Sequence, residues 1–167
     1  GLAGELSKKN YDLVIYTVDS VDRLQSYLSS LPLTGNLDGL VIMSLPVEDT
    51  YVNHLLKHNI PTVLIEFPNA KLNSVEIDDV AGGRMVAEYL VAKGHRRIAF
   101  LGDTDLPEYS IHPVSLRLVG FRQRLKEGGI VLEDEFVRLA PYTLEQTRQV
   151  AIELLNTANP PTAIFAA

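Results

Sequence analysis

The 167-residue chain contains no cysteine. The absence of cysteine excludes disulfides, thiolate metal ligands and a cysteine nucleophile. The chain also has no excess of positive charge, since 15 lysines and arginines stand against 21 acidic residues, giving a net charge of −6 at pH 7. A domain that grips a phosphate backbone is normally basic, so we do not expect these residues by themselves to bind nucleic acid.

Long apolar segments are also missing. No apolar run approaches the ~18 residues needed to span a bilayer, and the N-terminus lacks the basic and apolar regions of a signal peptide. Together with the absence of cysteine, this favours a cytoplasmic location without a membrane anchor. Hydrophobic residues at 46% and charged residues at 22% are typical of a globular chain with a real core.

Short apolar runs alternate with amphipathic segments along the chain. The segments that predict strands are 11–18, 37–43, 61–67, 74–78, 97–102, 135–140 and 162–167. The segments that predict helices are 21–31, 48–59, 80–94, a stretch beginning near 115, and 143–156. Continuous apolar strands that alternate with helices are typical of a parallel sheet covered on both faces, so the predicted class is α/β.

This alternation breaks at residues 68–79, where two extended runs follow each other with no helix between them. Two sheets, one on each side of this seam, fit the pattern better than one large sheet. We interpret Asp78 as a crossover residue and Asp79 as the N-cap of the next helix. Residues 1–10 look like the end of a helix with no strand before it, so we expect the chain to be part of a larger protein.

Several segments together resemble the effector-binding core of LacI/GalR-type transcriptional repressors. They are DGLVIMS, NIPTVLIEF, SVEIDDVAGGRMVAEYLVAKGHRRIAFLGD, RLVGFRQRLKEGGI and PPTAIFAA, and the resemblance extends from about Leu13 to Ala167. It implies a type I periplasmic-binding-protein-like fold with two lobes, residues 1–77 and 78–167, hinged around a small effector. It also implies that a helix-turn-helix headpiece and the first strand of the N-terminal lobe lie outside these residues.

Arg117 is the leading candidate for a ligand-binding residue. It lies among apolar residues in VSLRLVGFRQRL, in the expected first turn of a helix that follows a strand. In a doubly wound sheet this position faces the ligand crevice, and the planar guanidinium suits hydroxyls, a carboxylate or a ring carbonyl. The spacing alone equally allows a surface arginine packed over Phe121. The family resemblance implies an effector contact.

Five further candidates follow predicted strands. The resemblance places Glu66 at the mouth of the cleft, although a solvated carboxylate is the alternative. Phe67 either stacks on a ligand ring or closes the core. The resemblance implies an aromatic contact at Tyr142, although its APYT context departs from the usual family pattern. Ser44 is a polar candidate at the end of a strand, and Asp103 either contacts ligand or caps a turn.

No constellation of catalytic residues is found. Phosphate-loop and nucleophile-elbow motifs are absent, and His54 and His58, four residues apart, form no zinc motif with a third ligand. The loop histidine His112 is interpreted as exposed. We therefore expect no enzyme activity, no cofactor and no metal.

The resulting hypothesis is the effector-sensing domain of a LacI-type regulator that binds a small sugar-like or nucleobase-like molecule. Palindromic operators imply a homodimer, and operator DNA would be bound through the headpiece outside these residues. A periplasmic sugar-binding protein of an ABC transporter is the main alternative. A flavodoxin- or Rossmann-type enzyme is a third possibility, which a bound flavin or nicotinamide would reveal.

Overall fold

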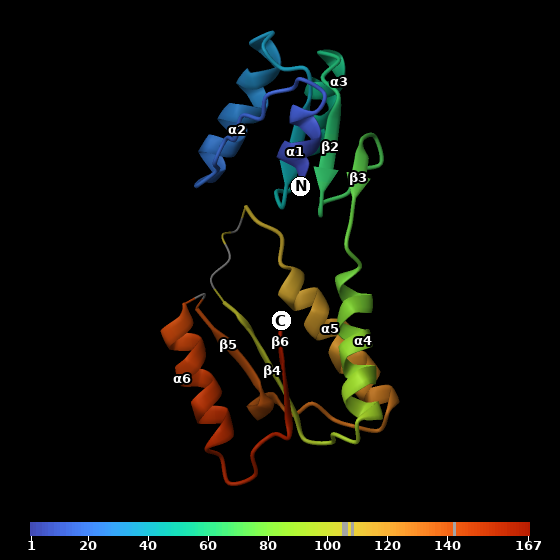
Figure 1. Ribbon diagram of the computed structural model, residues 1–167, viewed down its shortest axis with the longest axis vertical. Helices are drawn as coiled ribbons and strands as arrows, with labels where there is room; N and C mark the ends of the chain where they lie inside the picture. Colours follow the sequence, from blue (N-terminus) through green and yellow to red (C-terminus); the bar gives the residue numbers. More distant parts are fainter. Residues whose placement is uncertain (105–106, 108, 142) are drawn as a thin grey trace. The chain divides into compact units, whose positions relative to one another are not determined.

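The computed structural model describes residues 1–104, 107, 109–141 and 143–167 (Figure 1). The chain forms two compact units, Gly1–Leu40 with Glu48–Pro61, and Val41–Val47 with Thr62–Ala167. The described strands form two three-stranded sheets. The order of the first is β1 (Leu40–Met43), β2 (Thr62–Ile65), β3 (Asn73–Val75), and that of the second is β5 (Val137–Ala140), β4 (Ile98–Asp103), β6 (Ala163–Ala166). The α/β class and the two sheets flanking the seam are thus confirmed, while the lobe boundary at residues 77 and 78 stays a prediction.

The elements follow the predicted alternation closely. The helices are α1 (Leu2–Ser7), α2 (Val21–Ser30), α3 (Asp49–Lys57), α4 (Asp79–Ala92), α5 (Pro113–Glu127) and α6 (Leu144–Leu155), with 3₁₀ turns at Leu31–Leu33 and Asp134–Phe136. The strands are β1 (Leu40–Met43), β2 (Thr62–Ile65), β3 (Asn73–Val75), β4 (Ile98–Asp103), β5 (Val137–Ala140) and β6 (Ala163–Ala166). The pairs β2–β3, β4–β5 and β4–β6 are parallel.

Local side-chain chemistry explains where several helices begin and end. The hydroxyls of Ser20 and Thr143 accept hydrogen bonds from backbone N–H groups in the first turns of α2 and α6. Gly94, with φ of +88°, terminates α4 in the left-handed conformation that glycine adopts without strain. The N-cap of α4 is Asp78, which accepts from the N–H of Ala81. The prediction that Asp79 is this cap was wrong.

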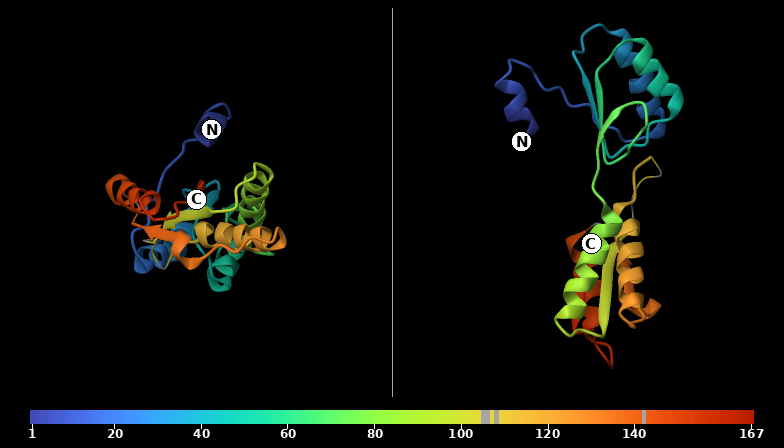
Figure 2. Two further views of the ribbon diagram at one scale, coloured as in Figure 1. Left: turned by 90° about the horizontal axis from the view of Figure 1, so that it is seen from below. Right: turned by 90° about the vertical axis from the view of Figure 1, so that its right-hand side faces the viewer.

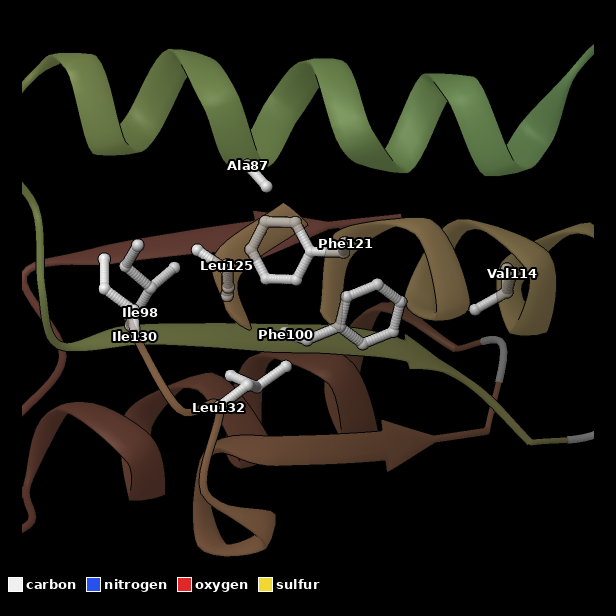
Figure 3. Close-up of a cluster of buried hydrophobic side chains, with 8 residues drawn as sticks. All are labelled: Ala87, Ile98, Phe100, Val114, Phe121, Leu125, Ile130 and Leu132. Atoms are coloured by element: carbon white, nitrogen blue, oxygen red, sulfur yellow. The ribbon is translucent and has the colours of Figure 1, made fainter. Parts of the chain in front are cut away.

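The sheet β5-β4-β6 contains the best-packed core. Residues 98–102 of β4 are buried, as expected of a central strand with a helix layer on each side. Figures 1 and 2 show α4 and α5 side by side, with the strands between them and α6. Figure 3 shows side chains of α4, α5 and β4 that converge in this core; they include Ala87, Phe100, Phe121 and Leu125, all fully buried.

Helices α4 and α5 approach each other so closely that glycine is required on both. A Cβ on Gly83 would lie 2.0 Å from the carbonyl oxygen of Arg117, and a Cβ on Gly120 would lie 1.9 Å from that of Val80. Neither position therefore has room for a side chain. The two glycines fix the backbone of Arg117 against the start of α4.

An ion pair also joins α4 to α5 at the surface. Arg84 donates from both terminal nitrogens to the carboxylate of Glu127, at 2.8 Å each. The hydrogen bond to Arg84 lowers the pKa of Glu127, and the same bond raises the pKa of Arg84. Because both groups are exposed, this pair contributes less to stability than the buried apolar contacts.

One predicted strand is not formed. Residues 11–19 are not part of any strand, and the side chains of Leu13, Val14, Ile15 and Tyr16 are 42% to 76% exposed. A strand needs a neighbour to satisfy its backbone N–H and C=O groups, and no described strand pairs with this segment. Leu56 of α3 and Leu155 of α6 are also about half exposed, although both are leucines of helices.

Candidate functional site

The carboxyl ends of β1 and β2 bring two of the predicted residues together. Ser44 directly follows β1, and Glu66 directly follows β2. The Ser44 hydroxyl donates a hydrogen bond to Oε2 of Glu66, and both side chains are half-buried. The N–H of Ser44 also donates to the carbonyl of Ile65 at 3.1 Å, and the N–H of Glu66 to that of Val75 at 2.9 Å. The two strand ends are therefore tied together through backbone and side chains.

The backbone at these two residues is unusual. Four described non-glycine residues have positive φ: Asn10, Ser44, Asn59 and Glu66. Asparagine tolerates this left-handed region, but serine at +58° and glutamate at +72° do so at a steric cost. Strained residues of this kind concentrate at binding and catalytic sites. The positive φ angles therefore fall on two of the residues that the sequence proposed separately as ligand contacts.

Phe67 and Asp103 lie at the ends of different sheets. Phe67 follows Glu66 and is half-buried. Asp103 is the last residue of β4 and borders a hollow of about 110 Å³ at the carboxyl ends of β4, β5 and β6. The other residues around this hollow are Leu101, Gly102, Ala140, Pro141, Thr147, Ala166 and Ala167. The hollow by itself is smaller than the roughly 300 Å³ at which small-molecule sites begin.

Arg117 lies in the second turn of α5 and is bound to a residue of α4. Its Nε donates to Oδ1 of Asp79 at 2.8 Å, with the Arg117 side chain 34% exposed and that of Asp79 10% exposed. The sequence offered a surface arginine packed over Phe121 or an effector contact, and neither interpretation included this pairing with Asp79. Its contact with an effector stays a prediction.

Asp79 and Thr147 are the neighbours that the sequence reasoning missed. Asp79 was interpreted as a helix cap, because nothing in the sequence indicates a pairing across 38 residues. Thr147 lies on α6 and reaches the hollow beside Asp103. The available signal was its place near the start of a helix that follows a predicted strand. The predicted Tyr142 lies outside the described residues.

His54 and His58 contact other groups of the protein, whereas His112 is exposed, as the sequence predicted. The His54 and His58 rings meet edge to face at 4.6 Å, and Nε2 of His54 lies 3.2 Å from the carbonyl oxygen of Ser29. His112 is the N-cap residue of α5 without a side-chain capping bond. Among the described residues, no three histidine or acidic side chains are grouped as a metal site would require. Within the same residues, no helix has the length and apolar character to cross a membrane.

A second hollow, of about 330 Å³, lies away from the strand ends. It is lined by Ser29 of α2 and by Thr50, Tyr51 and His54 of α3. None of the predicted binding residues that the structure describes borders it. Parallel α/β folds bind ligands at the carboxyl ends of strands, which favours the residues after β1, β2 and β4 as the candidate site.

Comparison with known proteins defines the class to which this fold belongs. The sequence model of periplasmic binding proteins and the sugar-binding domain of the LacI family matches residues 1–167. The chain therefore belongs to this family and has its periplasmic-binding-protein-like fold, which confirms the resemblance stated above.

Similar proteins within this family include transcriptional regulators. The chain is 29% identical to the HTH-type transcriptional regulator CelR of Thermobifida fusca, covering 100% of the chain and 49% of that protein. It is 29% identical to catabolite control protein A of Priestia megaterium, covering 93% of the chain and 46% of that protein. The chain thus spans about half the length of these relatives. They are transcriptional regulators, which favours the regulator hypothesis over a transport protein.

Two similar structures contain sugars. A CelR–cellobiose complex has a TM-score of 0.73 and 26% identity, covering 99% of this chain and 50% of that chain. A LacI family transcriptional regulator from Enterococcus faecium with bound ribose has a TM-score of 0.71 and 26% identity, covering 96% of this chain and 57% of that chain.

Proposed function

We propose that this chain is the effector-binding part of a LacI-type DNA-binding transcriptional regulator. The observation that carries the proposal is the match of the LacI-family sugar-binding domain over residues 1–167. The naming of the relative CelR as an HTH-type transcriptional regulator supports it. The ligand would be a small sugar-like or nucleobase-like molecule, bound between lobes 1–77 and 78–167. It would be recognised rather than chemically changed, so no enzyme activity is expected.

The ligand-binding groups would lie at strand ends and in one helix turn. Glu66 and Ser44 offer a carboxylate and a hydroxyl held in strained backbone, which suits recognition of ligand hydroxyls. Phe67 and Tyr142 would supply apolar faces for a ring. Arg117 would donate to ligand oxygens, and the sixth contact would come from Asp103 beside its hollow.

Besides the effector, the proposed partners are operator DNA and a second copy of the protein. Operator DNA would be bound by a helix-turn-helix segment outside these residues, in keeping with the net charge of −6 of the chain. Two copies would be required to place two headpieces on a palindromic operator in the cytoplasm. Effector binding would favour one arrangement of the lobes and so change operator affinity.

The test is a thermal-shift screen of the full-length protein with neutral saccharides, including cellobiose and ribose, and with nucleobases. We expect at least one compound to raise the melting temperature, because a ligand that binds the folded state stabilises it. Arg117→Ala should abolish this rise while leaving operator binding in a gel-shift assay intact.

Arg122→Ala is the matched control. Arg122 lies on the same helix but donates to Asp134 and to the carbonyl of Leu132, away from the strand ends. It should keep the full ligand-induced rise. Equal rises in wild type and Arg117→Ala would exclude Arg117 from the site, and a screen without any stabilising compound would contradict the proposed ligand class.

A further inference from the structure

The partner of Arg117 determines how its guanidinium can be used. Asp79 accepts from Nε of Arg117 at 2.8 Å, and this carboxylate is the more buried member of the pair. Among the described residues, Asp79 is the hydrogen-bond partner of the Arg117 guanidinium, and Nη1 and Nη2 are not engaged. The Nε–H group of the guanidinium is therefore bonded to the protein, whereas the N–H groups of Nη1 and Nη2 are available to donate hydrogen bonds to a ligand.

The backbone on both sides of this pair is held rigidly. Gly83 lies against the carbonyl of Arg117, and Gly120 lies against that of Val80, one residue after Asp79. Separating Arg117 from Asp79 would require a rotamer change within a close helix crossing. A buried carboxylate left without its partner would also pay a desolvation cost. The pair is therefore expected to persist when a ligand arrives.

The charges nearby do not favour an anion. Asp78 and Asp79 both lie at the start of α4, and their negative charges offset the partial positive charge of this helix end. The single cation of Arg117 is already balanced by Asp79. A phosphate or carboxylate at Nη1 and Nη2 would therefore meet no net positive charge.

We propose that Asp79 is a positioning residue for Arg117 and also selects the charge of the effector. It orients the guanidinium through Nε and cancels its charge, so that Nη1 and Nη2 serve an uncharged hydroxyl or carbonyl and an anionic effector such as a sugar phosphate is rejected. This inference rests on the proposed function, in which Arg117 contacts the effector.

The charge-selection step is tested with inorganic phosphate on the full-length protein. The Nε–H signal of Arg117 is followed by NMR at constant ionic strength, after assignment by its loss in Arg117→Lys. We expect no saturable shift in wild type with millimolar phosphate. Asp79→Asn keeps the Oδ1 acceptor but removes the charge, so it should acquire a saturable shift.

Asp78→Asn is the matched control, because it removes a neighbouring charge from the same helix end while keeping a good N-cap. It should behave as wild type. Saturable phosphate binding by wild type would overturn the proposal, and so would its absence in Asp79→Asn or its appearance in Asp78→Asn.

The positioning step is tested with the saccharide or nucleobase that stabilises the wild type in the screen. Asp79→Ala should weaken its binding at least about tenfold, whereas Asp79→Asn should rescue most of the affinity. Equal losses of affinity in Asp79→Ala and Asp79→Asn would overturn the positioning role of Asp79, because asparagine keeps the Oδ1 acceptor. If Arg117→Ala does not alter this binding, the proposed site fails, while the phosphate titration still reports separately on charge selection by Asp79.

Discussion

Ser44 and Glu66 combine left-handed backbone with a shared hydrogen bond at adjacent strand ends. Each feature restricts the other, because the hydrogen bond requires the side-chain directions that this backbone produces. A serine hydroxyl bonded to a half-buried carboxylate offers both a donor and several acceptor positions in a fixed geometry. At the scale of single residues, this pair and the Arg117–Asp79 pair each fix a polar side chain that we propose contacts the effector.

Ser44→Ala should lower the free energy of unfolding by about 1 kcal/mol, because Glu66 loses a donor in a half-buried position. Ser74→Ala is the control, since Ser74 donates to Glu76 in the same way on the surface of β3. Its cost should stay below about 0.5 kcal/mol. Urea denaturation measures both, and equal costs would argue against a special environment at the ends of β1 and β2.

At the scale of elements, the crossing of α4 and α5 holds Arg117 in place. Both helices contribute a glycine whose missing side chain allows backbone contact, and Phe121 and Leu125 pack below the crossing on Phe100 of β4. The position of the guanidinium therefore depends on residues that never touch a ligand. A shift of either helix would move Arg117 away from Asp79.

Gly83→Ala should destabilise the protein by at least about 3 kcal/mol or prevent folding, because its Cβ would overlap the carbonyl of Arg117. Gly82→Ala is the matched control, since its Cβ would meet nothing within 4 Å. It should stabilise α4 by about 0.5–1 kcal/mol through the higher helix propensity of alanine. Thermal or urea unfolding distinguishes the two, and a tolerated Gly83→Ala would contradict the close crossing.

At the scale of the whole molecule, the two sheets differ in how well they are packed. Strand β4 is central in its sheet and buried along almost its whole length. Strand β3 is short and lies at the edge of the other sheet, with Val75 60% exposed. Local opening should therefore cost much more free energy in β4 than in β3.

Hydrogen exchange measured by mass spectrometry checks this difference. We expect the amides of β4 to be the most protected of the chain and those of β3 to exchange at least about a hundredfold faster. The reason is that β4 has partners on both edges and helices over its faces, whereas β3 pairs only with β2 among the described strands. Similar protection in the two strands would contradict the difference in packing.

Helix ends were predictable from the sequence, whereas one strand was not. The side-chain caps at Ser20 and Thr143 and the left-handed Gly94 act within a few residues of themselves, and the helices predicted at 21–31, 80–94 and 143–156 lie within two residues of those observed. The Tyr11–Val18 run has the composition of a strand but forms none, because a strand also needs a partner from elsewhere. The composition of a segment predicts whether it can form a strand, but a neighbouring strand must be present for it to form one.

The sequence by itself determined the α/β class, the two sheets around residues 68–79, the family and the polar residues at strand ends. These depend on periodicity and on residues close together in the chain. Only the tertiary structure decided that Ser44 meets Glu66 across 22 residues and that Arg117 meets Asp79 across 38. Such contacts arise because strand pairing and helix packing bring together residues whose separation along the chain carries no local signal.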